Sequence, residues 1–343
     1  MRTFSESYKF QITPITPIHI GSGEDINPGE YFIFDTEEMI YIIDMGHLAA
    51  KLNKPESRKT ILGWIESDPI GWVAKAKNNK DLESHIRKYS QFSCEVTEQV
   101  AEKIRERWGE GKSQLTIQMM PRVGKTVYIP GSSIKGALRT ALLWHFAEKP
   151  LPNNIINDGI SNNTSWERIV LGGSSRDIQN DPLRHIKISD AIAKDVQTVV
   201  FDTKHVGMKT NRGEQAELQD YRECLPDTIC ENPSYTINAI LTIESGHQHF
   251  QDENLSTRLT KDIILQSCRE FYTRVFESDR QYWRRNGNVD QDIISEMEAR
   301  IIDTTSQDTA PIRLGWGCGM DTISLNLAKR PGSHPPRGIN YRF

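Results

Sequence analysis

The sequence lacks the long apolar runs and the paired cysteines that mark membrane, secreted or zinc-binding proteins. No window approaches the stretch of about 20 apolar residues that spans a membrane, and the opening Met-Arg-Thr-Phe-Ser-Glu-Ser does not resemble a signal peptide. The five cysteines are odd in number, scattered, and form no CxxC pair, so neither a zinc knuckle nor a disulfide framework is indicated. We therefore expect a cytoplasmic protein with no membrane partner, no metal and no cofactor.

Signatures of catalysis are also scarce. The nine histidines form neither HExxH nor any i, i+4 pair, and there is no GxSxG segment. Because histidine titrates near neutral pH, four of them are candidates for acid–base work in RNA cleavage: His19, His205, His247 and His249. Asp25 and Asp190 could hold a metal, although aspartates at loop and strand ends commonly cap turns instead.

The net charge also limits the classes of function that the protein can have. A net charge of −4 over 343 residues argues against a free-standing nucleic-acid binder coated in positive charge, but it allows a localised basic groove. The length is enough for one large or two medium domains with real cores.

The apolar periodicity predicts a mixed α+β protein. Alternating or short apolar runs predict strands at 8–12, 115–120, 127–129, 186–191, 198–202 and 235–244, and a β-hairpin from 30–34 and 39–44. Helical spacing predicts several helices within 57–108, a long helix within 255–283 and another at about 290–303. Residues 150–184 are polar and predict an irregular insertion.

The stretch 128–146 carries the clearest functional signal. Pro130–Gly131 ends a strand, and Ser132 or Ser133 could cap the helix that follows by accepting a backbone N–H. Lys135 and Arg139 lie four residues apart on this helix, where like charges repel. Because a helix N-terminus favours anions, the two cations beside it predict a phosphate cradle.

Two other interpretations of this stretch remain open. Gly131 and Gly136 have the GxxxxG spacing of a nucleotide-binding P-loop, but Ala137 and Leu138 stand where that motif requires Lys and Ser or Thr. ATP hydrolysis is therefore disfavoured. An ordinary amphipathic helix with two solvated cations would show the same local pattern.

Two further glycine-rich loops and one basic segment accompany this helix. Gly21-Ser22-Gly23-Glu24-Asp25 forms a tight loop that allows close approach to a ligand, and the alternate glycines of 315–319 can arrange N–H groups around an anion. Residues 203–213 are basic and predict either a functional loop or a disordered surface loop. The position of the helix between the two glycine loops suggests a shared groove for an RNA backbone.

In their order along the chain, these segments resemble the RAMP superfamily of CRISPR-associated proteins. The residues that carry the resemblance are Thr16-Pro17-Ile18-His19-Ile20-Gly21-Ser22-Gly23, residues 129–139, Ile188-Ser189-Asp190-Ala191, Glu223-Cys224-Leu225 and Gly315-Trp316-Gly317-Cys318-Gly319. The opening TPIHIGSGE and the closing RLGWGCGMDT look most like the subunit that caps the crRNA 3′ end in type III-A (Csm) effector complexes.

The resemblance implies a ferredoxin-like (RRM-type) core with a second related half. Residues 1–225 would form an N-terminal domain with a helical insertion at about 46–112 and a thumb-like loop at about 203–222, in which Met208 is the best candidate for a wedge between bases. Residues 226–343 would form a C-terminal domain with the glycine-rich loop 315–319 and a flexible tail.

The resemblance also implies a non-catalytic subunit that binds the crRNA backbone. The implied partners are crRNA, target RNA, and the adjacent backbone and small subunits of the Csm complex. The residues predicted to contact RNA are His19, Gly21, Ser22, Ser132, Ser133, Lys135, Arg139, Lys204, His205, Lys209, Arg212, Arg313, Gly315, Trp316 and Gly317. The alternatives are a metal-independent crRNA-processing ribonuclease that uses His19 or His205, and a phosphometabolite-binding enzyme.

Overall fold

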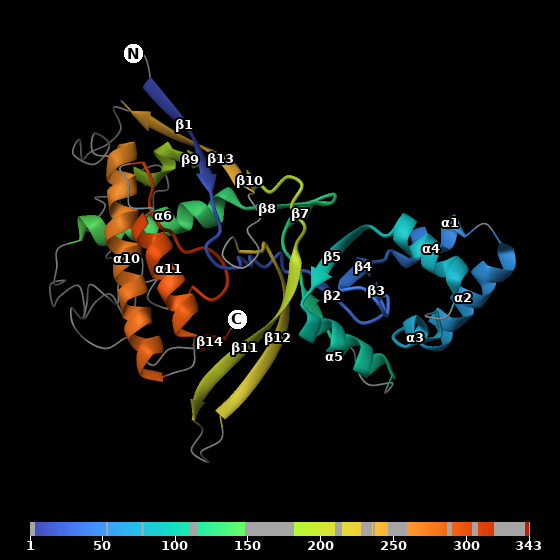
Figure 1. Cartoon of the computed structure of the whole chain (residues 1–343). Helices are drawn as coiled ribbons and strands as arrows, with labels where there is room; N and C mark the ends of the chain where they lie inside the picture. Colours follow the sequence, from blue (N-terminus) through green and yellow to red (C-terminus); the bar gives the residue numbers. More distant parts are fainter. Residues whose placement is uncertain are drawn as a thin grey trace, which may run out of the picture. The chain divides into compact units, whose positions relative to one another are not determined.

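Figure 1 shows the computed structural model of the chain. It describes residues 4–52, 54–76, 79–109, 115–147, 182–209, 215–227, 235, 237–245, 259–286, 290–303, 308–318 and 340–342. Most of the predicted insertion at 150–184, His247, His249, Gly319 and most of the C-terminal tail lie outside these ranges. Within them, no helix is both long and apolar enough to cross a membrane.

The predicted α+β class is confirmed, with two β-sheets and helices that accompany both. The chain divides into two compact units whose segments interleave. Unit 1 contains residues 1–15, 129–193 and 228–339, and unit 2 contains residues 16–128, 194–227 and 340–343. The single boundary predicted between 225 and 226 lies close to one of the crossings between units. The chain also crosses after 15, 128, 193 and 339, because strands distant in sequence pair with each other.

Unit 1 is built around strand β13 (Ile237–Ser245). It pairs antiparallel with β1 (Phe4–Ile12) on one edge and with β9 (Ile186–Ile188) and β10 (Ala191–Ile192) on the other. Alternate residues of β13 are buried, as the sequence pattern predicts. The helices of this unit are α6 (Gly131–Phe146), α10 (Lys261–Asn286) and α11 (Gln291–Asp303). A short 3₁₀ turn at Pro182–His185 lies between α6 and α10 in the chain.

The second sheet lies within unit 2 and has the strand order β2-β6-β12-β11-β5-β4-β3, with β14 paired to β11. Its strands are β2 (Asp25–Ile26), β3 (Tyr31–Ile33), β4 (Met39–Ile42), β5 (Phe92–Val96), β6 (Ile117–Gln118), β11 (Val199–Lys209), β12 (Gln215–Cys224) and β14 (Asn340–Arg342). The helices are α1 (Met45–Lys51), α2 (Pro55–Ser67), α3 (Trp72–Ala76), α4 (Lys80–Tyr89) and α5 (Glu98–Gly109). A small hairpin, β7 (Arg122–Val123) and β8 (Thr126–Ile129), follows β6.

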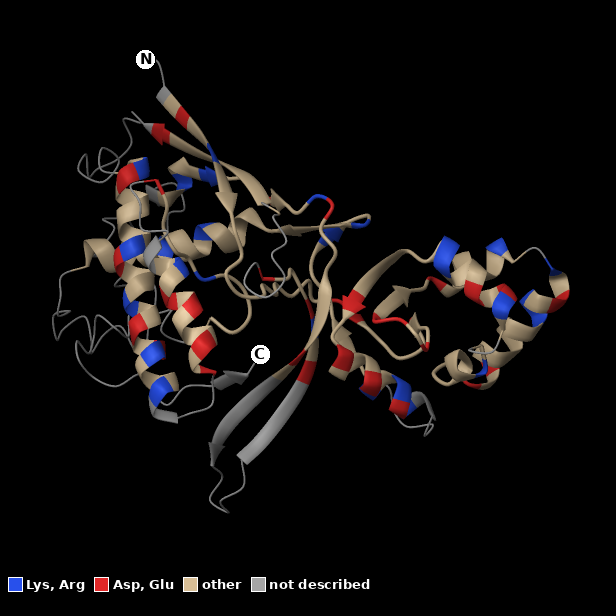
Figure 2. Cartoon of the chain, viewed as in Figure 1, with Lys and Arg blue, Asp and Glu red and all other residues tan. Residues whose placement is uncertain are grey.

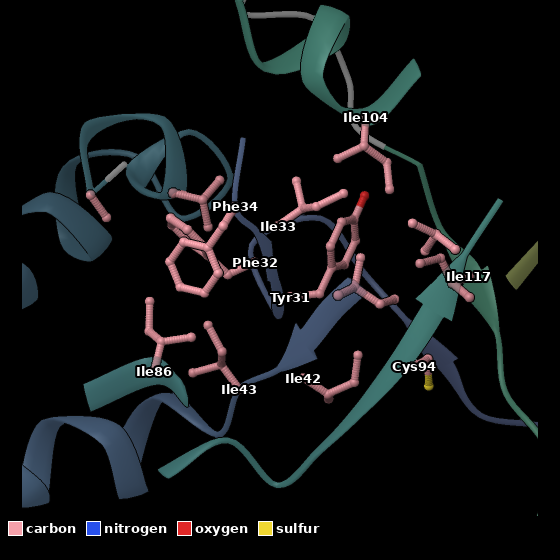
Figure 3. Packing of buried hydrophobic residues seen from close by; sticks show 14 of the residues in the cluster. Tyr31, Phe32, Ile33, Phe34, Ile42, Ile43, Ile86, Cys94, Ile104 and Ile117 are labelled. Atoms are coloured by element: carbon pink, nitrogen blue, oxygen red, sulfur yellow. The ribbon is translucent and has the colours of Figure 1, made fainter. Parts of the chain in front are cut away.

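The core of unit 2 forms where β3 and β4 meet the helices. Figure 3 shows Tyr31, Ile33 and Ile42 gathered with Ile86 of α4 and Ile104 of α5, and these side chains are almost completely buried. The polar end of the Tyr31 ring is satisfied, because its hydroxyl donates to the carbonyl of Leu115 at 2.9 Å. Apolar burial of this extent is the main driving force that holds the helices against the sheet.

Two predictions about this unit are wrong in detail. The block 57–108 is not all helical, because Phe92–Val96 forms β5, which pairs with β4 and β11. Its buried Cys94 and Val96 alternate with less buried residues, which is the period of a strand. Residues 203–209 are not a loop: they continue β11, which pairs with β12 to form a long hairpin.

A candidate nucleic-acid interface

The glycine loop of residues 20–24 is held at both ends in unit 2. Ile18 and Leu225 exchange backbone hydrogen bonds of 3.0 and 2.9 Å, and the N–H of Ser22 donates to the carbonyl of Met119 at 2.9 Å. The hydroxyl of Ser22 accepts from the N–H of Glu24 at 3.0 Å, which stabilises the turn. Gly21 and Ser22 are exposed, so this anchored loop presents backbone and a small polar side chain to solvent.

His19 forms the buried base of this loop. Only 4% of its surface is exposed, and its Nδ1 lies 2.7 Å from the carbonyl oxygen of Glu223. A carbonyl only accepts, so Nδ1 carries the proton. Burial lowers the pKa of the imidazole below its ordinary value, against the opposing effect of the Glu223 hydrogen bond. His19 is therefore neutral near pH 7, and its Nε2 is unprotonated.

The carboxylate of Glu223 is the structural hub behind His19. It is completely buried and forms an ion pair with Arg122. It also accepts from the Thr198 hydroxyl at 2.6 Å and from the N–H of Met120 at 3.0 Å. A buried charge needs partners of this kind. Glu223 thus ties β12 to the start of β11 and to the segment after β6, and so fixes the carbonyl that holds His19.

The cysteines around this hub are inert. Burial raises the pKa of the Cys94 and Cys224 thiols, and the charge of Glu223 raises both further. Neither thiol is in a disulfide.

In unit 1, the start of helix α6 differs from the prediction. The N-cap residue is Pro130, and no side chain of the helix caps it, so the predicted capping role of Ser132 or Ser133 is wrong. Instead the carboxylate of Asp190 accepts from the N–H of Gly131 at 2.8 Å. An anionic side chain thus already lies at the positive end of this helix.

Gly131 is required by packing rather than by ligand approach. A Cβ built on it would lie 2.3 Å from the carbonyl oxygen of Ile188 and 2.9 Å from that of Ser189. The backbone before Asp190 therefore passes directly over the first turn of α6. This close approach is what allows Asp190 to reach the helix.

Lys135 and Arg139 lie on α6 as predicted, both of them partly exposed. The buried stripe of the helix contains Ile134, Leu138 and Ala141, which have the three- and four-residue spacing of an amphipathic helix. Helix α6 has no acidic residue, whereas Figure 2 shows basic and acidic residues interspersed along α10. The cations of α6 therefore have no acidic neighbour within their own helix, unlike those of α10.

The loop at 313–318 belongs to the same unit as α6. Gly315 and Gly317 have φ angles of 83° and 85°, the alternate left-handed positions predicted for a backbone nest. Arg313 lies 2.5 Å from the carboxylate of Asp279 and also donates to the carbonyl of Cys318. Its charge is partly neutralised, which makes it a weaker phosphate ligand than the sequence suggests.

Helix α10 contacts two of the predicted segments. The hydroxyl of its Tyr272 donates to the carbonyl of Ala137 in α6 at 3.1 Å, and Asp279, two turns further along α10, pairs with Arg313. Helix α6 and the 313–318 loop therefore both contact α10. Trp316, in the same loop, is partly buried.

Three of the remaining predicted residues lie on β11. Lys204, His205 and Lys209 are in β11, where backbone pairing with β12 and β14 is described but their side chains are not. Arg212 lies outside the described residues. Asp25, a possible metal ligand, is in β2, and within the described ranges no group of three or more His, Cys, Asp or Glu gathers as a metal site.

Sequence reasoning did not identify the roles of Glu223, Arg122 and Asp190. For Glu223 and Asp190, the available signals were their places in Glu223-Cys224-Leu225 and Ile188-Ser189-Asp190-Ala191, two segments that carry the family resemblance. Neither signal names a partner, because the partners are distant in sequence. Arg122, for example, lies 101 positions from Glu223.

Comparison with known proteins identifies the class. The RAMP superfamily model matches residues 11–319, so the chain belongs to this superfamily, as the sequence predicted. The curated relatives include "CRISPR system Cms protein Csm5" of Methanocaldococcus jannaschii, which is 30% identical over 332 residues, or 93% of this chain and 73% of that protein. The protein of the same name from Streptococcus thermophilus is 26% identical over 231 residues, covering 66% of this chain and 62% of that protein.

Solved structures show the same fold. A chain in the cryo-EM structure of a Csm–crRNA–target RNA ternary complex of a type III-A CRISPR-Cas system matches with a TM-score of 0.64 at 18% identity, covering 92% of this chain and 86% of that chain. The crystal structure of T. onnurineus Csm5 matches with the same TM-score and identity, covering 90% of each chain. At this identity the likeness concerns the fold.

Proposed function

We propose that this chain is a Csm5-like subunit of a type III-A CRISPR effector complex that binds the 3′ part of the crRNA and caps the backbone filament. The observation that carries the proposal is the similarity to Csm5 along 93% of the chain. The proposed partners are crRNA, target RNA, and the adjacent backbone and small subunits. The proposed compartment is the cytoplasm.

The chemistry of the described residues supports backbone binding without base readout. Unit 2 offers an exposed, anchored glycine loop, and unit 1 offers Lys135 and Arg139 on a helix without acidic residues. Contacts to phosphate and sugar position a nucleic acid but carry no sequence information. A subunit that must accept many different guides needs this kind of contact.

We also propose a ferredoxin-like half and a thumb-like hairpin for this chain. In unit 1, antiparallel strands flank β13, and α6 and α10 pack together with the Trp144 and Phe271 rings 5.9 Å apart. These features support a ferredoxin-like half. The long β11–β12 hairpin supports the thumb-like role inferred for residues 203–222.

The first prediction tests the basic pair on α6. Lys135→Ala combined with Arg139→Ala should lower crRNA retention in the purified complex. The slope of log affinity against log salt should also become shallower by about 0.7 for each phosphate that the variant no longer neutralises. Both quantities are measured on co-expressed complex, by quantifying bound RNA and by titrating RNA at several salt concentrations.

Lys59→Ala combined with Lys75→Ala is the matched control. Both lysines are exposed on helices of unit 2, and the double change removes the same charge. Equal crRNA content in the α6 variant and this control would contradict the proposed role of the basic pair.

Two further assays separate the alternatives. Labelled repeat RNA incubated with the purified protein, with and without EDTA, should stay intact, and cleavage under either condition would favour the ribonuclease. A thermal shift with nucleotides and no co-purifying RNA would favour the phosphometabolite enzyme.

A further inference from the structure

The Nε2 atom of His19 is a hydrogen-bond acceptor that is accessible to a ligand. Nδ1 is committed to the carbonyl of Glu223 at 2.7 Å. Among the described residues, no hydrogen bond to Nε2 is found. Nε2 is also not among the described side-chain atoms that are both fully buried and without a hydrogen-bond partner. Since it has no partner among these residues, it must be in contact with solvent. A nearly buried ring thus keeps one nitrogen accessible.

The glycine loop leaves the space in front of this nitrogen open. The Cβ that Gly21 lacks would lie 3.7 Å from Nε2, and Gly21 itself is exposed. Any larger side chain at position 21 would stand over Nε2. The absence of a side chain here therefore gives a ligand access to the acceptor.

The chemistry of the acceptor selects among the groups of an RNA backbone. An unprotonated imidazole nitrogen accepts hydrogen bonds, and so do phosphate oxygens. Phosphate is therefore a poor partner for Nε2. The ribose 2′-hydroxyl is the backbone group that donates, it occurs at every position regardless of sequence, and DNA lacks it.

We propose that Nε2 of His19 accepts a hydrogen bond from a ribose 2′-hydroxyl of the bound RNA and makes the site selective for RNA over DNA. This inference rests on the proposed function, and it changes the role first predicted for His19 from acid–base or phosphate chemistry to recognition of the sugar. The bond to Glu223 makes that carbonyl the positioning group for the ring.

The test uses Gly21→Ala in the full chain, since replacing His19 would also remove the bond to Glu223. A contact of 3.7 Å is an ordinary van der Waals separation, and Gly21 has no left-handed φ, so the variant should fold like the wild type. The probes are a single-stranded RNA, the all-DNA strand of the same sequence, and RNAs with single 2′-deoxy positions, titrated at one salt concentration.

The wild type should bind the RNA more tightly than the DNA. An RNA with a 2′-deoxy sugar at one particular position should show part of the same loss of affinity. Gly21→Ala should weaken RNA binding about fivefold, in the range expected for one hydrogen bond, and should lower the affinity for DNA by less, so that the preference for RNA falls. Gly63→Ala is the control, because Gly63 lies in α2 with nothing near its missing Cβ. It should keep the RNA preference of the wild type.

The possible failures are distinguishable. If the wild type binds no RNA, the proposed function is overturned and the inference falls with it. If the wild type binds RNA but no single 2′-deoxy position weakens binding, the role of His19 is overturned and the proposed function stands. The same holds if Gly21→Ala keeps the full preference for RNA over DNA. Thermal unfolding of each variant establishes that the comparison concerns folded protein.

Discussion

Gly21 in unit 2 and Gly131 in unit 1 look alike in the sequence, yet their surroundings are opposite. Each stands beside a serine in a segment that predicts a phosphate-binding turn. At Gly131 a side chain would collide with the carbonyl of Ile188 at 2.3 Å, whereas at Gly21 it would reach only the Nε2 of His19 at 3.7 Å. Gly131 is therefore needed for close packing, whereas Gly21 leaves the Nε2 acceptor accessible.

The difference shows that a glycine near a helix start or in a loop does not by itself indicate a ligand. The helix that follows Gly131 already has the Asp190 carboxylate at its N-terminus, which competes with any incoming phosphate. The loop at Gly21 has a neutral imidazole beneath it instead. The two proposed contacts therefore differ in chemistry: cationic side chains in unit 1 and a sugar-directed acceptor in unit 2.

The largest effect is expected from removing the support of the unit 2 loop. Glu223→Ala leaves Arg122 without its buried partner and leaves the Thr198 hydroxyl and the Met120 N–H without an acceptor. Breaking one side of a buried pair costs about 3–5 kcal/mol. Denaturant unfolding should show this loss in the free energy of unfolding.

An exposed pair provides the control for this prediction. Lys54 and Asp81 lie 3.0 Å apart with both side chains largely in solvent, and Asp81→Ala should cost less than about 1 kcal/mol. Similar losses of unfolding free energy in both variants would mean that Glu223 is not a structural hub.

A smaller loss is expected at the packed glycine of unit 1. Gly131→Ala forces the first turn of α6 away from Ile188, and overpacking of this kind costs about 1–3 kcal/mol. Gly136→Ala, five residues further along the same helix and in open space, should instead gain about 0.5–1 kcal/mol, because alanine is the better helix residue. Equal melting temperatures for the two variants would remove the distinction between Gly131 and an ordinary helical glycine.

The smallest effect is the pH dependence that His19 contributes to stability. Its pKa in the folded state is lowered by burial, so below about pH 6.5 the unfolded state binds more protons than the folded one. The contribution of His19 is complete above that pH and is lost as the pH falls toward the folded-state pKa. His19→Gln, which cannot titrate, should show a smaller fall in urea midpoint between about pH 7.5 and about pH 5.5 than the wild type. An equal fall would show that other groups account for it.

Local pattern was sufficient for much of the fold. The alternation of β13, the β3–β4 hairpin and helices α6, α10 and α11 follow directly from apolar periodicity, since burial of one face is a property of neighbouring residues. Strand β5 was missed because a five-residue strand between two helices has too little periodicity of its own. Its partners β4 and β11 supply the pairing.

The sequence by itself determined the superfamily, the α+β class, and the presence of glycine loops beside a basic helix, because motifs and periodicity are carried by residues close together in the chain. The tertiary structure decided what each glycine is for, which carboxylate caps α6, and which nitrogen of His19 is protonated. Those properties depend on Ile188, Asp190 and Glu223. Each acts on a residue dozens of positions or more away, through contacts that only the folded chain creates.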